Sequence, residues 1–265
     1  MADTVRFIFA SDFHVPLQSE LTIEKLLKEI KEFKPNVLIL GGDLLEADAA
    51  SRFQTEPDWE LANEYQEGNK ILRRIRSACS SNYNLTIPSE RISAGKCSLV
   101  FMNGNHENNL ISKGRISKAV RSLCDFNLHI DELKYWKQFP YHYSKAGVFR
   151  LGQISMAHGY EAGVSSDEMQ GYVLGMPYGL FISGHTHRPL QVTQGMRTKT
   201  IPLPYWYCNS GLCADPNAFE YMERRKKILW GNAYVKGEVV LLKSPRHNRN
   251  WSAETVIVRG YDYFS

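Results

Sequence analysis

The chain has 265 residues, of which 43% are hydrophobic and 12% aromatic, and its formal net charge is +4. It can bury a sizeable core, and so mild a charge does not by itself indicate a nucleic-acid partner. No run approaches eighteen consecutive apolar residues, so we expect no membrane span and no membrane partner. The apolar run in the opening stretch "MADTVRFIFASDFH" is too short for a signal peptide.

The cysteines are odd in number, scattered and without a CxxC pair. They are Cys79, Cys97, Cys124, Cys208 and Cys213. This usage favours reduced thiols that serve as small buried apolar residues. We therefore expect a cytoplasmic protein, in the host cytoplasm if the gene belongs to a phage.

The first forty residues predict a strand, a helix and a second strand. Val5–Ala10 is densely apolar and predicts a buried strand. Ser19 is the expected N-cap of a helix with apolar residues at helical spacing from Leu21 to Phe33, and Pro35 closes it. Asn36–Leu40 predicts another buried strand, and strand–helix–strand is the unit that builds a parallel pair.

Further elements follow at shorter intervals. A second helix should begin at Pro57 and Asp58 and present one apolar face as far as Cys79, and Ser80–Lys96 is polar enough for a long loop. The strands expected after it are Cys97–Met102, two strands joined by a turn within Gly147–Gly159, Tyr178–Ser183, "WYCNS", "NAYVKG" and "EVVLLKS". Without repeats or linkers, the chain is predicted to be one domain over residues 1–265, with an insertion at about residues 46–96.

Polar residues follow five of these strands directly. The clusters are "SDFH" with Asp12 and His14, "GGDLLE" with Asp43, "NGNHEN" with Asn105 and His106, "AHG" with His158, and "GHTH" with His185 and His187. Ligands of α/β proteins bind at this carboxyl edge of the sheet. The glycines beside these residues allow sharp turns and close approach of the backbone.

Together these clusters contain two aspartates, one asparagine and four histidines, with His106 left over. Mixed oxygen and imidazole ligands suit Mn²⁺, Fe, Ni²⁺, Co²⁺ or Zn²⁺. Seven ligands are too many for one such ion, but they suit two ions if one carboxylate bridges them. The sequence therefore predicts a binuclear metal site, with Mn²⁺ the preferred ion.

The ordered blocks D-x-H, G-D, G-N-H-E, H and G-H-x-H resemble the calcineurin-like metallophosphoesterases, over about residues 5–210. The length of the chain is similar to that of compact bacterial and phage-borne members of this family. The resemblance implies an α/β fold in which two mixed β-sheets pack as a sandwich flanked by α-helices. It also implies ligand roles: Asp12, His14 and His187 for the first metal, Asn105, His158 and His185 for the second, Asp43 as the bridge, and His106 beside the substrate as the catalytic histidine.

One departure bears on the substrate. Protein phosphatases of this family carry an arginine shortly after the bridging aspartate, whereas here Leu44 and Leu45 follow Asp43 and the first arginine is Arg52. "GGDLLE" resembles the nuclease and phosphodiesterase branches. We therefore expect hydrolysis of a phosphodiester, in nucleic acid or a nucleotide, by a hydroxide that bridges the metals. The alternatives are a phosphomonoesterase acting on a small molecule or phosphoprotein, and a scaffold that keeps the fold without the chemistry.

Several other residues are weaker candidates. Arg188 and Asn108 are expected to touch substrate, whereas Glu46, Asp48 and Glu107 are interpreted as supporting or solvated acids and not as ligands. Basic runs at residues 223–227 and 243–250 lie among aromatic residues that include Trp230 and Trp251. Cationic and aromatic side chains together are typical of single-strand binding, although solvated faces explain such runs too.

Overall fold

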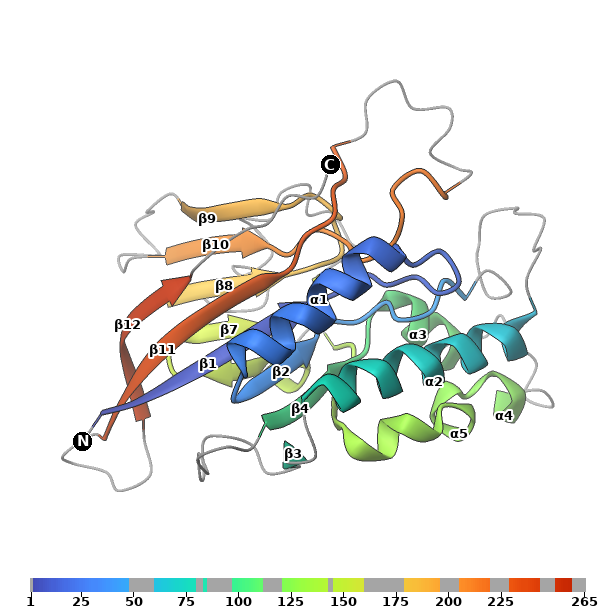
Figure 1. Ribbon diagram of the computed structural model, residues 1–265, viewed down its shortest axis with the longest axis horizontal. Helices are drawn as coiled ribbons and strands as arrows, with labels where there is room; N and C mark the ends of the chain where they lie inside the picture. Colours follow the sequence, from blue (N-terminus) through green and yellow to red (C-terminus); the bar gives the residue numbers. More distant parts are fainter. Residues whose placement is uncertain are drawn as a thin grey trace.

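The computed structural model describes residues 2–47, 60–79, 83–84, 97–111, 121–142, 145–159, 179–195, 205–219, 229–243 and 251–258. Within these ranges the chain forms two β-sheets stacked face to face, with helices over the outer side of the first sheet (Figure 1). No helix in the described part of the chain is long and apolar enough to cross a bilayer. The prediction of an α/β fold with two mixed sheets and flanking helices is confirmed.

The first sheet is mixed. Its order is β12 (Trp251–Val258), β11 (Val235–Lys243), β1 (Ala2–Ala10), β2 (Val37–Leu40), β4 (Cys97–Met102) and β3 (Tyr83–Asn84), with β5 (Lys137–Phe139) also paired to β4. Strands β1, β2 and β4 run parallel, and β11 runs antiparallel to β1. The carboxyl ends of the three parallel strands therefore meet at one edge.

The second sheet is mixed as well. Its order is β6 (Phe149–Leu151), β7 (Ile154–Met156), β8 (Gly179–Ser183), β10 (Tyr205–Asn209) and β9 (Leu190–Gln194). Strand β8 runs parallel to β7 and β10, while β6 and β9 run antiparallel to their neighbours. The predicted pair of strands within Gly147–Gly159 is confirmed as β6 and β7, which turn at Gly152.

The helices fill the connections. They are α1 (Glu20–Phe33), α2 (Leu61–Ala78), α3 (Asn105–Ile111), α4 (Arg121–Cys124) and α5 (Phe126–His129), with 3₁₀ turns η3 (Asp131–Tyr135) and η4 (Lys145–Gly147). The expected cap of α1 is confirmed, because the Ser19 side chain accepts a hydrogen bond from the Thr22 amide at 3.3 Å. Helix α1 ends where Lys34 takes a left-handed conformation, one residue before Pro35.

Two cores lie on the two faces of the first sheet, because side chains alternate along each strand. One set faces α1 and α2: Ile8, Ala10, Leu38, Leu40, Leu99 and Phe101. The alternate set faces the second sheet: Phe7, Phe9, Val37, Ile39, Val100 and Met102. Strands buried on both faces read as continuous apolar runs, which is why the sequence predicts them well.

Two predicted boundaries are wrong. Helix α2 begins at Leu61 and not at Pro57, since Glu60 has an extended backbone. "NAYVKG" and "EVVLLKS" are not two strands, because residues 235–242 of β11 pair without interruption along β1, and Gly237 lies in the ladder opposite Phe7 instead of in a turn.

Helix α2 lies in the connection between β2 and β4 and packs on α1. The single-domain boundary and the insertion at about residues 46–96 stay predictions. All five cysteines are free, and four of them are buried, as expected for small apolar residues.

Candidate metal centre

The loops that follow β1 and β2 bind to each other through their backbones. The amide of Asp12 donates to the Gly42 carbonyl at 3.0 Å, and the amides of Phe13 and His14 both donate to the Asp43 carbonyl, at 2.9 and 3.0 Å. This pairing extends the parallel contact of β1 with β2 beyond the strand ends. It brings the D-x-H and G-D clusters to one place, as the carboxyl-edge argument predicts.

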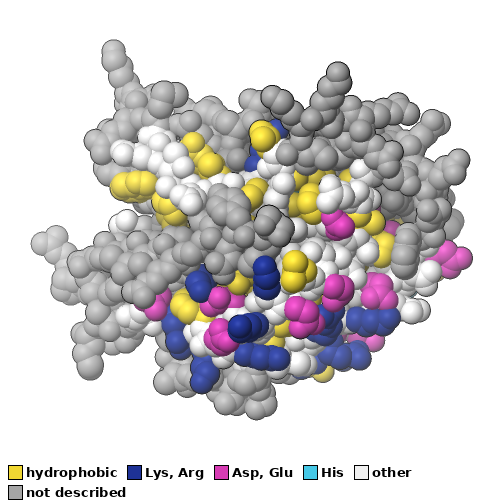
Figure 2. Space-filling view, turned by 45° about the horizontal axis from the view of Figure 1, so that its top comes forward, with side chains coloured by type: hydrophobic (Ala, Val, Ile, Leu, Met, Phe, Trp, Pro, Cys, Tyr) yellow, Lys and Arg dark blue, Asp and Glu magenta, His cyan; other side chains and the backbone are white. Residues whose placement is uncertain are grey.

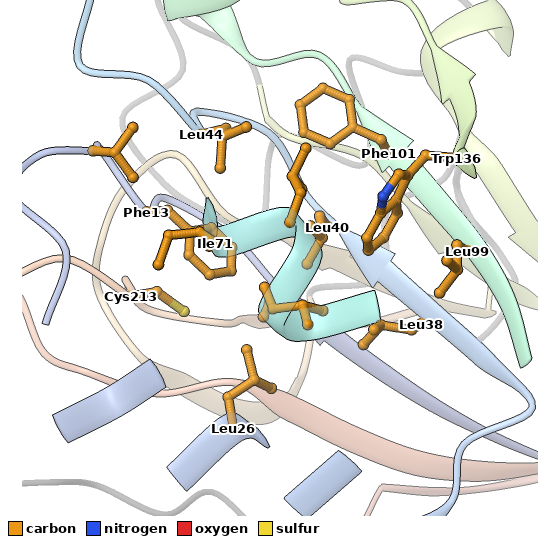
Figure 3. Close-up of a cluster of buried hydrophobic side chains, with 14 of the residues drawn as sticks. Phe13, Leu26, Leu38, Leu40, Leu44, Ile71, Leu99, Phe101, Trp136 and Cys213 are labelled. Carbon is orange, nitrogen blue, oxygen red and sulfur yellow. The ribbon is translucent and has the colours of Figure 1, made fainter. Parts of the chain in front are cut away.

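Apolar side chains inside these two loops anchor them in the helix-side core. Phe13 stands between Asp12 and His14, and Leu44 follows Asp43; both are about 1% exposed. Figure 3 shows Phe13 and Leu44 among the buried side chains around Ile71 of α2. Phe13 and Leu44 thus hold the two loops on the helix-side core, while their neighbours Asp12, His14 and Asp43 contribute to the polar cluster at the strand ends.

The backbone at the site is in an unusual conformation. Seven non-glycine residues of the described segments have positive φ. Five of these are predicted ligands: Asp12, His14, Asp43, His185 and His187, with φ between 47° and 67°. Asp and His tolerate the left-handed region better than most residues, and such strain persists where surrounding structure imposes it, often at functional sites.

A first group of donor atoms comes from Asp12, His14 and His187. The Nε2 atom of His187 lies 3.2 Å from Oδ1 of Asp12 and 3.1 Å from Nε2 of His14. All three side chains are buried. One carboxylate oxygen and two imidazole nitrogens thus converge on the same small volume.

A second group comes from Asp43, His158 and His185, and Asn105 joins it. The Nε2 atom of His158 lies 3.2 Å from Oδ2 of Asp43 and 2.9 Å from Oδ1 of Asn105. The rings of His158 and His185 meet edge to face, with centroids 5.1 Å apart. The four predicted ligands of this group therefore lie together.

Asp43 connects the two groups. Its Oδ2 atom is 3.2 Å from Nε2 of His158 in the second group and 4.0 Å from Nε2 of His14 in the first. The same oxygen lies 3.9 Å from Nε2 of His106. The carboxylate thus lies between the two groups, and its role as a bridging ligand stays a prediction.

Two glycines leave the space that the carboxylates occupy. A Cβ atom at Gly104 would lie 2.0 Å from Oδ1 of Asp43, and one at Gly184 would lie 2.3 Å from Oδ2 of Asp12. Both distances are far inside van der Waals contact. A side chain at either position would displace a predicted ligand.

Two ligand histidines are oriented through their second nitrogen. Nδ1 of His14 lies 2.5 Å from Oε2 of Glu46, and Nδ1 of His158 lies 2.8 Å from the carbonyl oxygen of Gly41. In each ring this contact leaves Nε2 to face the donor groups. Metal-binding histidines commonly have such a partner, which fixes the tautomer and the ring orientation.

Glu107 holds the loop of the bridging aspartate. Its carboxylate accepts backbone hydrogen bonds from Asp43 (3.0 Å), Leu44 (2.7 Å), Leu45 (3.1 Å) and Gly104 (2.8 Å). It is fully buried, and four amide donors satisfy it. Glu107 is thus a supporting acid, consistent with its interpretation from the sequence.

The turn after β10 supplies supports that the motifs do not reveal. The Asn209 side chain donates to the Gly184 carbonyl at 2.6 Å and to Thr186 Oγ1 at 3.1 Å, which braces the G-H-x-H loop. Ser210 Oγ lies 2.7 Å from Ser11 Oγ, and Ser11 in turn donates to Asp12. The only sequence signal for these roles is the polar "NSG" that begins at the last residue of β10.

His106 is more exposed than His14, His158 and His187, and His185 is likewise only partly buried. The His106 side chain is 24% exposed, against 1% for His14 and His158. Its backbone amide donates to Oδ1 of Asp43 at 3.0 Å, and its Nδ1 contacts the carbonyl oxygen of Glu46. The ring is thus fixed beside the donor groups, and it has access to solvent.

The charges of the site compensate one another. Burial alone would raise the pKa of Asp43, but the nearby imidazoles of His158, His106 and His14 outweigh it and hold this pKa well below its usual range. Burial would lower the pKa of His158, but Asp43 and Asp12 raise it to about 9. For His185, burial and the neighbouring His158 both lower the pKa, to about 3. His185 is therefore a neutral imidazole at physiological pH.

These side chains fit divalent transition-metal ions. Carboxylate oxygen, amide oxygen and imidazole nitrogen are the ligands that Mn²⁺ and its neighbours accept. The two donor groups meet at a shared carboxylate, and partners outside the groups fix the orientation of His14 and His158. Two buried carboxylates stand among four imidazoles, a donor set that divalent transition-metal ions would bind.

The remaining predicted residues are less informative. Arg188 is exposed next to His187, and Asn108 is half-buried in α3, so their contact with substrate stays a prediction. Asp48, Arg52 and residues 223–227 and 244–250 lie outside the described residues.

In α2, Arg74 pairs with Glu20 and Glu24. Figure 2 shows that basic and acidic side chains are interspersed on the face of the molecule drawn there. Arg74, in the basic run "RRIR" of α2, is therefore explained by a solvated face.

A scan against protein-family models and a search of curated proteins both find no match. Among solved structures, the phosphoesterase Yfce from E. coli matches at 14% identity and TM-score 0.36, over 95% of this chain and 98% of that one. Vacuolar protein sorting 29 from Cryptosporidium parvum matches at 14% and 0.40, over 99% and 98%. The NAD nucleotidase of Haemophilus influenzae matches at 9% and 0.40, over 100% of this chain and 60% of that one. With likeness at this level, the case for function rests on the chain's own side chains.

Proposed function

We propose that this protein is a metal-dependent phosphoesterase that hydrolyses a phosphodiester in nucleic acid or a nucleotide. The observation that carries the proposal is the position of Asp43, whose Oδ2 atom lies within 4.0 Å of Nε2 of His14, His106 and His158. One carboxylate oxygen thus serves two groups of metal donors and adjoins the histidine predicted to be catalytic. That arrangement suits chemistry on a phosphoryl group held across two cations.

Bound at this site, two divalent ions would activate a water molecule for attack on phosphorus and neutralise charge on the phosphoryl oxygens. The chain's own contribution is to hold the donors. Asp12, His14 and His187 form one half, Asn105, His158 and His185 the other, and Asp43 belongs to both. Asn105 is neutral, which limits the negative charge that an anionic substrate meets.

His106 is the residue placed to act on the leaving group. Its Nδ1 contacts the Glu46 carbonyl, so Nε2 is the nitrogen that remains for the substrate. With its side chain 24% exposed, His106 has access to solvent and therefore to a substrate that enters from it. We assign it proton donation from Nε2 to the leaving oxygen.

The residues after the bridge support a diester substrate. Protein phosphatases of the family that the motifs resemble carry an arginine there, to grip a dianionic phosphate. Here Leu44 and Leu45 are at most 1% exposed and belong to the helix-side core. Trp230 lies beside the first donor group, with its ring centroid 4.3 Å from that of His187 in an edge-to-face contact, and an aromatic ring near the site favours a substrate that carries a base.

The test compares bis(p-nitrophenyl) phosphate with p-nitrophenyl phosphate, each with Mn²⁺ and with the ions removed by chelation. We expect Mn²⁺-dependent hydrolysis with the higher kcat/KM for the diester. A large preference for the monoester would replace the diesterase proposal with a phosphomonoesterase. A pure protein that binds no metal under saturating Mn²⁺ would instead indicate a scaffold.

A further inference from the structure

We infer that Glu46 is a positioning residue that sets the first metal site by holding His14. Its Oε2 atom lies 2.5 Å from Nδ1 of His14, and both side chains are buried. The opposite nitrogen of the ring, Nε2, lies 3.9 Å from Oδ1 of Asp12 and 3.1 Å from Nε2 of His187. The contact thus aims the metal-binding nitrogen at its group. The inference rests on the proposed metal centre.

The two halves of the site are oriented by partners of different charge. His14 is held by a carboxylate, whereas His158 in the second group is held by the neutral carbonyl oxygen of Gly41. A charged acceptor raises the basicity of the imidazole more than a neutral one does. The first group therefore depends on a side chain that mutation can remove, and the second depends on the backbone.

Glu46 also contacts His106, the residue predicted to be catalytic, but through its backbone. Its carbonyl oxygen contacts Nδ1 of His106, while its carboxylate is 4.0 Å from that nitrogen. A side-chain variant should therefore keep the main contact of His106. This separation lets an experiment on Glu46 report on the first metal site rather than on the proton donor.

His14, Glu46 and His106 also lie close enough together to be a candidate metal group of their own. The geometry favours positioning, since His14 contacts Glu46 at hydrogen-bond distance and turns its other nitrogen toward Asp12 and His187. A third bound ion is the competing outcome, and a titration that counts ions distinguishes it.

The experiment is a Mn²⁺ titration followed by the electron paramagnetic resonance signal of free Mn²⁺, on the full-length chain. His14→Ala and Asn105→Ala identify the first and second sites by the binding phase that each variant weakens. Glu46→Ala should weaken only the His14 phase, by about 10–100-fold. Glu46→Gln keeps an acceptor oxygen and should restore part of that loss.

The matched control is Glu64→Gln. Glu64 is also a buried acid, and its carboxylate accepts from the Ala47 amide at 2.7 Å, a bond that the oxygen of glutamine can also accept. It should leave both binding phases at wild-type affinity. Thermal melting of each variant shows that the protein is folded before binding is compared.

Three results would overturn the inference: unchanged affinity in Glu46→Ala, equal weakening of both phases, or a third Mn²⁺ in the wild type that Glu46→Ala removes. These differ from failure of the proposed function. If the wild type binds two ions and cleaves the diester, and Glu46→Ala has unchanged Mn²⁺ affinity, the proposed function stands and the role of Glu46 is rejected. A wild-type chain without metal would reject both.

Discussion

Replacing Gly104 by alanine should disable the site by displacing Asp43. The added Cβ would lie 2.0 Å from Oδ1, 2.5 Å from the backbone nitrogen and 2.7 Å from Cγ of Asp43. Ordinary contact begins near 3.4 Å, so the carboxylate would have to retreat by about 1.4 Å, the difference between 3.4 and 2.0 Å. Because a misplacement of about 1 Å can cost about 10²-fold in rate, we expect kcat/KM for the diester to fall at least about 100-fold.

The effect on stability should be smaller than the effect on activity. Overpacking costs about 1–3 kcal/mol, and each kcal/mol lowers Tm by about 2–4 °C in a domain of this size. The assays are hydrolysis of bis(p-nitrophenyl) phosphate, Mn²⁺ binding and thermal melting. The protein should remain folded at room temperature with little activity and weakened metal binding.

Gly68→Ala is the matched control. Gly68 lies in α2 and packs on the same loop, but its added Cβ would be 3.3 Å from the tip of Leu45 and 3.5 Å from Leu44. Alanine also favours a helix interior over glycine by about 0.5–1 kcal/mol. This variant should keep its activity and melt at the wild-type temperature or slightly above. If Gly104→Ala worked within a few-fold of wild type, the reasoning about Asp43 would be refuted.

Two further predictions concern the histidines. His106→Asn should retain both metals. It should slow hydrolysis of an alkyl ester by about 10²–10⁴-fold but slow that of a nitrophenyl ester little, because a nitrophenolate leaves without a proton. Equal losses on both substrates would exclude the general-acid role. The pKa of His158 in the metal-free protein is about 9, so a bound metal must displace its proton at pH 7.5. Mn²⁺ affinity should therefore rise between about pH 6.5 and 8.5, and calorimetry in two buffers should detect proton release; a pH-independent affinity without release would contradict this.

The ligand set was predictable because its signals are local. Each predicted ligand follows a dense apolar strand, and Gly42, Gly104 and Gly184 stand beside three of the clusters. Parallel pairing brings the ends of β1, β2 and β4 together in one sheet and those of β7 and β8 together in the other, and the stacking of the two sheets places these ends side by side. The structure gathers all seven residues there, although their metal roles stay a prediction.

The supporting residues were not predictable in the same way. Glu107 acts through four backbone amides, and Asn209 acts through a carbonyl and a hydroxyl of another loop. Such contacts depend on how loops distant in sequence meet, which no spacing encodes. The long strand β11 was divided in the sequence prediction for a related reason, since Gly237 resembles a turn residue until its pairing with Phe7 is known.

The most direct test of the central claim is the number of Mn²⁺ ions bound per chain, measured by elemental analysis after gel filtration. We predict two ions for the wild type and for Asp131→Ala, a variant of an exposed aspartate. Asp43→Ala removes the carboxylate shared by both groups, so it should bind far less metal and hydrolyse no diester. An Asp43→Ala protein that held two ions and worked at a near-normal rate would contradict the assignment of this site.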